Sequence, residues 1–107
     1  ELAILRDGRE LRSYGSQGEQ RLALLALLLA ERAVLADERD RVPLMLLDDV
    51  MSELDLARRE LLSHELSGGG QSVVATTDLA HVPGAGDRTV TRLRISSGTI
   101  LQEAIAA

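Results

Sequence analysis

Two short strand-like runs joined by a helix-length segment constrain the fold of this chain more than any other feature. The first run, residues 42–47, is wholly apolar and ends in two carboxylates, Asp48 and Asp49; the second covers residues 71–76. A short apolar run that ends this way is typical of a strand buried on both faces. Strands joined by a helical crossover lie parallel, so we expect an α/β fold built on a largely parallel sheet.

Two substantial helices accompany these strands. The first is expected to begin after Ser16, where Glu19 completes a capping-box pattern, and to continue to about Ala36. Its apolar run, residues 22–30, predicts a helix buried on most sides, and is far shorter than the ~20 residues that cross a bilayer.

The second helix is expected from Asp55 to about Leu66, with an apolar side made of Leu56, Leu61, Leu62 and Leu66. Parallel strands need helices on both faces and neighbouring strands at both edges. Since two helices cannot supply these layers, and the sequence begins at Glu1 rather than Met, we expect a fragment of a larger protein.

Two hairpins are expected at the ends of the chain. Asp7-Gly8 is a turn signal inside residues 2–13, and Ser97-Gly98 separates the alternating segment 89–95 from residues 99–101.

Composition excludes several classes of function. All 12 basic residues are arginine, so the chain contains neither a Schiff-base lysine nor a P-loop of the GxxxxGK[ST] type. It has no cysteine, and His64 and His81 are isolated, which excludes a zinc site made by these residue types alone. A net charge of −5 and a single aromatic residue, Tyr14, argue against a self-sufficient nucleic-acid-binding module.

The two carboxylates after the first strand form one candidate site. Open α/β folds bind their ligands at the carboxyl edge of the sheet, where these two residues are expected. One carboxylate there can hold Mg²⁺ against nucleotide phosphates, and its neighbour can orient or deprotonate an attacking water. The alternative interpretation is that Asp48 and Asp49 only begin a turn.

The start of the first helix forms a second candidate site. A helix N-terminus presents free amides and a partial positive charge that favour phosphate, and Gly18 allows close approach to the backbone. The alternative interpretation of Ser16 to Glu19 is an ordinary helix cap.

The order of these segments resembles the second half of an ABC-type ATPase head. Residues 15–20, Gly-Ser-Gln-Gly-Glu-Gln, resemble the ABC signature; residues 44–49 resemble Walker B, and residues 52–55 resemble the D-loop. Together with Thr76-Thr77-Asp78, the set is most similar to the RecF family of bacterial recombination mediators. The resemblance runs over nearly the whole chain and implies that residues 1–107 are the C-terminal part of such a head, without Walker A.

The resemblance implies a role in nucleotide binding for the signature. Ser16, Gln17, Gly18 and Glu19 would lie against the γ-phosphate of ATP held by the opposite protomer, with Ser16 and the Gly18 amide in contact with it.

It also implies roles for the acids that follow the strand. Asp48 would hold Mg²⁺, directly or through water, and Asp49 would act as general base or orient water. Asp49 stands where most ABC ATPases have glutamate, which implies slow hydrolysis. Ser52 and Asp55 would cross the dimer interface, and Thr77 occupies the position of the switch histidine.

For the complete protein, the resemblance implies ATP and Mg²⁺ as cofactors and ATP-dependent homodimerisation around duplex DNA. It further implies that the protein acts with RecO and RecR to load RecA at gapped DNA. The implied location is the bacterial cytoplasm, on the nucleoid, and no membrane partner is implied. The alternatives are the C-terminal half of another head, SMC-like or Rad50-like, and a non-catalytic interaction module. The roles of Arg21, Arg58 and Arg59 stay open.

Overall fold

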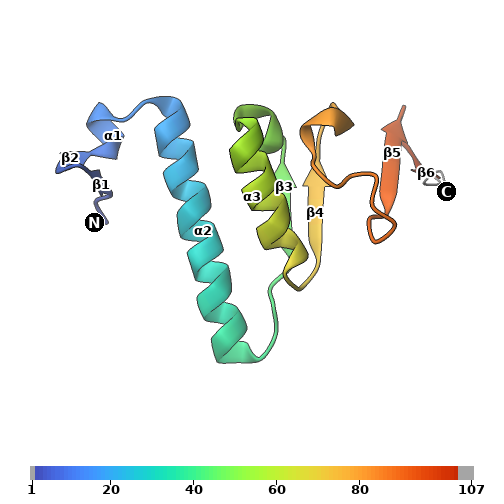
Figure 1. The fold of residues 1–107 in the computed structure, drawn as a ribbon, viewed down its shortest axis with the longest axis horizontal. Coiled ribbons are helices and arrows are strands. Elements are labelled where there is room, and N and C mark those ends of the chain that lie inside the picture. The colour runs from blue at the N-terminus through green and yellow to red at the C-terminus, as the bar shows by residue number, and fades with distance from the viewer. Residues whose placement is uncertain (1, 104–107) are drawn as a thin grey trace. The chain divides into compact units, whose positions relative to one another are not determined.

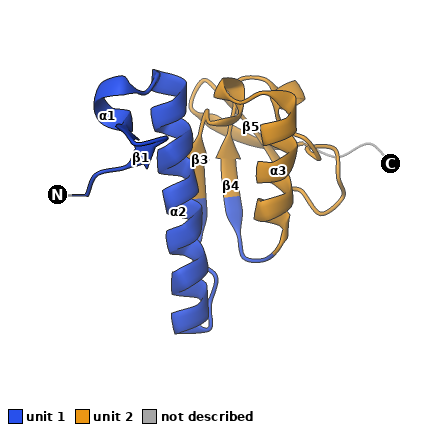
Figure 2. Ribbon diagram, turned by 60° about the vertical axis from the view of Figure 1, so that its left-hand side comes forward, with its two compact units in different colours: residues 1–45, 69–72 blue, residues 46–68, 73–107 orange. Residues whose placement is uncertain are grey.

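The structure is a computed structural model that describes residues 2–103 of the 107-residue chain (Figure 1). Its elements follow the order β1 (Leu5–Arg6), β2 (Arg9–Glu10), α1 (Leu11–Tyr14), α2 (Gln17–Arg39), β3 (Met45–Asp48), the 3-10 helix η1 (Met51–Glu53), α3 (Leu56–Ser67), β4 (Ser72–Ala75), the 3-10 helix η2 (Leu79–His81), β5 (Arg92–Ser96) and β6 (Thr99–Glu103). The chain divides into two compact units, which Figure 2 shows in different colours. The first ends at Met45 and includes residues 69–72; the second contains residues 46–68 and the chain from Val73 onward.

The first unit begins with the predicted hairpin. β1 and β2 pair antiparallel across Asp7 and Gly8, whose φ angles of 52° and 77° are those of a two-residue hairpin turn. The prediction that residues 2–13 are extended is wrong beyond Glu10, because α1 begins at Leu11. The Gln20 side-chain amide stabilises this short helix by donating to the carbonyl oxygens of Leu11 and Gly15, at 3.0 and 3.2 Å.

α2 follows with the predicted N-cap and continues past the predicted end at Ala36 to Arg39, where Asp40 closes it in a left-handed conformation. The prediction that this helix is buried on most sides is wrong. None of its residues is fully buried, and Leu24, Leu28 and Val34 are about half exposed. The apolar run consists of leucine and alanine, and residues 2–103 cover these three side chains only in part.

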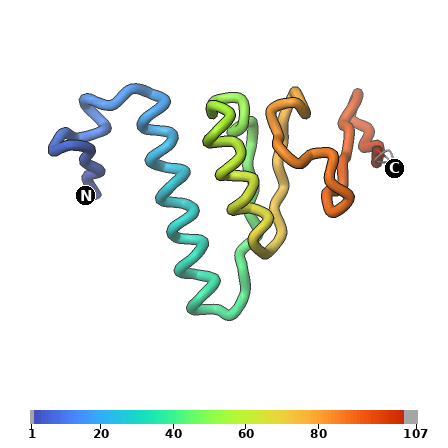
Figure 3. Tube along the Cα trace, in the orientation of Figure 1, coloured from blue at the N-terminus to red at the C-terminus, as the bar shows by residue number. Residues whose placement is uncertain are grey.

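One arginine joins the loops that lead into β3 and β4. Arg32 donates from Nε to the Pro43 carbonyl at 3.4 Å and from Nη2 to the Gly69 carbonyl at 2.7 Å. The path of the backbone from α2 into β3 can be followed in Figure 3. Gly70 adopts φ +74°, and a Cβ there would lie 2.5 Å from Val42 Cγ1. The backbone approaches Val42 closely at this point because the residue is glycine.

β3 and β4 form a parallel pair, as predicted. Met45 N donates to the Gln71 carbonyl and Asp49 N to the Ala75 carbonyl, so both strands advance in the same direction. The prediction of burial on both faces is wrong: Leu46 is 69% exposed and Val73 51% exposed. Burial alternates along β3, which is the pattern of a strand covered on one face.

The fully buried apolar residues within the described part of the chain are few: Met45, Leu47, Met51 and Leu62. α3 begins at its Asp55 cap, as predicted, and contributes Leu62 to this set. Leu56 and Leu61, which were expected on its buried side, are 66% and 67% exposed.

The second unit ends in the other predicted hairpin, with β5 and β6 paired across Ser97 and Gly98. Among residues 2–103, no helix combines the length and apolar character needed to span a membrane.

Candidate functional site

The first candidate site is the turn that begins α2, residues 15–19, hereafter the Ser16 turn. Ser16 Oγ accepts a hydrogen bond from the Glu19 amide at 3.1 Å, and Glu19 Oε2 accepts one from the Ser16 amide at 3.3 Å. This reciprocal capping box satisfies two of the four amides that an α-helix leaves unpaired at its start. The other two, from Gln17 and Gly18, have no carbonyl partner within the helix.

The chemistry of the Ser16 turn suits an anion. The Ser16 hydroxyl accepts from Glu19, and it still has a proton to donate. A Cβ built on Gly18 would meet no atom within 4 Å, so the surface beside the free amides is open. Gly15 has a different role, because a Cβ there would lie 2.7 Å from the Leu11 carbonyl oxygen.

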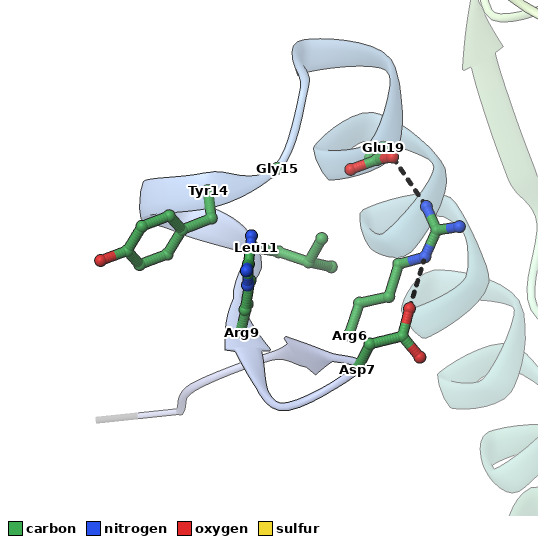
Figure 4. Close-up of a pocket in the computed structure, with 7 residues that line it drawn as sticks. All are labelled: Arg6, Asp7, Arg9, Leu11, Tyr14, Gly15 and Glu19. Carbon is green, nitrogen blue, oxygen red and sulfur yellow. Dashed lines mark hydrogen bonds and ion pairs between the residues drawn. The ribbon is translucent and has the colours of Figure 1, made fainter.

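An arginine from the hairpin neutralises the acid in this turn. Arg6 Nη1 lies 2.7 Å from Glu19 Oε1, and its Nε lies 3.8 Å from Asp7 Oδ2 (Figure 4). The two arginines of the hairpin, Arg6 and Arg9, line a cavity of about 410 Å³ together with Asp7, Leu11, Tyr14, Gly15 and Glu19. Sequence reasoning missed Arg6, since only the hairpin register brings it beside Glu19.

The second candidate site is the turn after β3, residues 48–55, hereafter the acid turn. Asp48 and Asp49 are both exposed where β3 ends. Asp49 adopts φ 52°, a left-handed conformation that aspartate tolerates better than most residues. Two hydrogen bonds fix its backbone: its amide donates to the Ala75 carbonyl at 2.9 Å, and its carbonyl accepts from Ser52 Oγ at 3.0 Å.

The predicted D-loop residues make local contacts in this turn. Ser52 holds the Asp49 backbone, as described above, and Asp55 caps α3 by accepting from the Arg58 amide at 2.9 Å. The Arg58 guanidinium pairs with the same carboxylate at 3.0 Å, both side chains being largely exposed.

Arg59 holds the centre of the acid turn, a contact that the sequence left open. Its Nε donates to the Met51 carbonyl at 2.8 Å, and the Met51 side chain is only 1% exposed. The anchored methionine and the arginine together fix η1 between Asp49 and Asp55.

The acids in the described part of the chain can contribute to a Mg²⁺ site without forming one alone. Within residues 2–103, no three acidic or histidine side chains gather closely enough to hold a metal ion. Mg²⁺ is usually held by one or two carboxylates together with phosphate oxygens and water, which a single exposed carboxylate at position 48 fits.

The segment after β4 contains the predicted switch residue. Thr77 is exposed, while Thr76 Oγ1 donates to the Asp78 carbonyl at 2.9 Å. His81 lies in η2 with its Nε2 3.9 Å from Asp78 Oδ2. His64 lies exposed on α3.

Comparisons with known proteins match the chain to one group. No family model matches it. It is 38% identical over 96 residues to the DNA replication and repair protein RecF of Bacillus subtilis, covering 90% of this chain and 26% of that protein. It is 51% identical over 72 residues to RecF of Symbiobacterium thermophilum, covering 67% of this chain and 19% of that protein.

A solved structure of the recombination mediator protein RecF-ATPrS in the RecFOR pathway has the same fold. Its TM-score is 0.70 at 37% identity, and the match covers 95% of this chain and 26% of the other. The chain thus spans about a quarter of the RecF proteins it matches. The likeness confirms the predicted fold class, α/β and the C-terminal half of an ABC-type ATPase head.

Two adjacent arginines provide a matched test of the acid turn. Arg59→Met keeps the apolar stem and leaves the Met51 carbonyl without its donor, so we expect a loss of about 1 kcal/mol in unfolding free energy. Arg58→Met removes only an exposed ion pair and should cost less than about 0.5 kcal/mol. Chemical denaturation and amide hydrogen exchange over residues 49–54 measure both; equal effects of the two variants would contradict this role of Arg59.

Proposed function

Because this chain is a relative of RecF that spans about a quarter of RecF's length, we propose that it supplies two motifs to a RecF-type ATPase head. The Ser16 turn is the signature, and the acid turn contains Walker B and the D-loop. The observation that carries the proposal is the start of α2, where two amides and a serine hydroxyl remain available to an anion.

The Ser16 turn binds the γ-phosphate of ATP held by a second protomer. The Gln17 and Gly18 amides and the Ser16 hydroxyl donate to phosphate oxygens, and the helix dipole adds a partial positive charge of roughly half an electron. Residues 1–107 contain no lysine and therefore no P-loop. The P-loop that holds the nucleotide must belong to another segment of the protein or to another molecule. In the proposed homodimer, that molecule is a second head, and ATP lies between the two.

The acid turn prepares the hydrolytic water. Asp48 faces the Mg²⁺ side, where the ion would neutralise phosphate charge, and Asp49 accepts the proton of the attacking water or orients it. The hydrogen bonds from the Asp49 amide to Ala75 and from Ser52 to the Asp49 carbonyl fix the backbone from which this carboxylate extends. Aspartate is one methylene shorter than glutamate, so its reach to the water is poorer and hydrolysis is slow.

The remaining residues couple these events between protomers. Ser52 and Asp55 lie at the dimer interface, and the Thr77 hydroxyl hydrogen-bonds phosphate or water but cannot carry the charge of a histidine. For the complete protein we propose ATP-dependent binding of duplex DNA at gaps, together with RecO and RecR, for recombinational repair in the bacterial cytoplasm, on the nucleoid. The support is the match to RecF proteins and to a RecF structure named for the RecFOR pathway.

Substitutions of Ser16 test the signature. In a RecF-type protein that contains residues 1–107, Ser16→Arg should weaken ATP-dependent dimerisation at least ~10-fold, because the side chain fills the phosphate position. Ser16→Asp should do the same by charge repulsion while keeping a good N-cap residue. Sedimentation with and without ATP measures the dimer, and ATP binding to the monomer should be unchanged.

Ser13→Arg is the matched control for Ser16→Arg, since it adds the same group on α1, outside the capping box. It should dimerise like the unmodified protein. Normal dimerisation of both Ser16 variants would contradict the proposed signature.

Two left-handed aspartates test the acid turn. Asp49→Asn should lower ATP turnover by about 10²-fold, the usual scale for losing a general base, while ATP-dependent dimerisation persists. Asp40→Asn is the matched control, because Asp40 has almost the same backbone conformation (φ 50° against 52° for Asp49) and lies outside the acid turn. The substitution should therefore have the same effect on the backbone and leave turnover unchanged. Normal turnover of Asp49→Asn would mean that Asp48 and Asp49 are turn acids in a non-catalytic module.

A further inference from the structure

An acid lies beside the proposed phosphate position, where it would oppose an anion. Glu19 Oε2 is 3.3 Å from the Ser16 amide, in the same turn as the free amides. A carboxylate here stabilises the helix, and the same negative charge repels phosphate. The signature proposed above therefore needs a compensating cation.

We propose that Arg6 is a positioning residue for this phosphate site, an inference that rests on the proposed signature function. Its guanidinium lies 2.7 Å from Glu19 Oε1, and the other oxygen of that carboxylate accepts from the Ser16 amide. One carboxylate thus connects Arg6 to the backbone of Ser16. Figure 4 shows Arg6 extending from the hairpin to Glu19.

The ion pair has two effects on the turn. It holds Glu19 in the orientation that completes the capping box, which keeps the Ser16 hydroxyl in place. It also offsets the carboxylate charge, so an incoming phosphate meets the amide dipoles of α2 rather than an unpaired anion.

The hairpin explains why the arginine stands at this place. The register pairs Arg6 directly with Arg9, and like charges in that position destabilise a strand pair. Arg6 relieves this repulsion through its contacts with Glu19 and Asp7. The hairpin and the Ser16 turn therefore stabilise each other.

Removal of the Arg6 charge tests the proposal in a RecF-type protein that contains residues 1–107. Arg6→Gln should weaken ATP-dependent dimerisation about 3- to 5-fold at low salt, the scale of an exposed ion pair. The defect should shrink above about 0.5 M salt, because repulsion between Glu19 and phosphate is screened. Arg41→Gln removes the same charge from an exposed residue outside the hairpin and should have no effect.

A second substitution distinguishes charge compensation from general damage to the fold. Glutamine also completes a capping box, so Glu19→Gln removes the repulsion and keeps the cap. The double variant Arg6→Gln with Glu19→Gln should therefore dimerise as the unmodified protein does.

Three outcomes would overturn the role of Arg6: normal dimerisation of Arg6→Gln, a defect independent of salt, or an unrescued double variant. Ser16→Asp in the same assay separates the two proposals. If Ser16→Asp abolishes dimerisation while Arg6→Gln does not weaken it, the signature stands and only the role of Arg6 fails.

Discussion

The reciprocal hydrogen bonds between Ser16 and Glu19 decide what the start of α2 offers to other molecules. They satisfy two amides internally and leave those of Gln17 and Gly18 without a carbonyl partner in the helix. The same bonds place an acid in the turn, and Arg6 of the preceding hairpin pairs with it. Stability of the helix and access for an anion thus depend on one small set of groups.

The acid turn is also stabilised by a small set of hydrogen bonds. Asp49 has a left-handed backbone, which costs free energy unless neighbouring groups hold it. Ala75 and Ser52 do so by hydrogen bonds, and Arg59 fixes the following residues through the Met51 carbonyl. The backbone that carries the Asp49 carboxylate is therefore fixed by these contacts.

Local signals in the sequence predicted the elements well. The Asp7-Gly8 and Ser97-Gly98 turns and the Ser16 and Asp55 caps depend on neighbouring residues, and the parallel strand pair follows from the helix-length segment between the two strands. Burial was predicted poorly, because it depends on layers that the described residues do not supply; Leu46 and Leu61 show this. The contacts of Arg6, Arg32 and Arg59 were also missed. An arginine side chain is long and flexible, so its hydrogen-bond partner depends on the three-dimensional path of the backbone rather than on the local sequence.

The central claim, that one protomer's Ser16 turn completes the site of another protomer's acid turn, is tested most directly by mixing two inactive variants. Both variants are made in a RecF-type protein that contains residues 1–107. A Ser16→Asp homodimer has no functional signature, and an Asp48→Asn homodimer has no Walker B acid at position 48. Neither homodimer should turn over ATP. A heterodimer has one of its two sites with both motifs intact, so each heterodimer that forms should turn over ATP at about half the rate of the unmodified dimer. No recovery, with heterodimers shown to form, would contradict the claim.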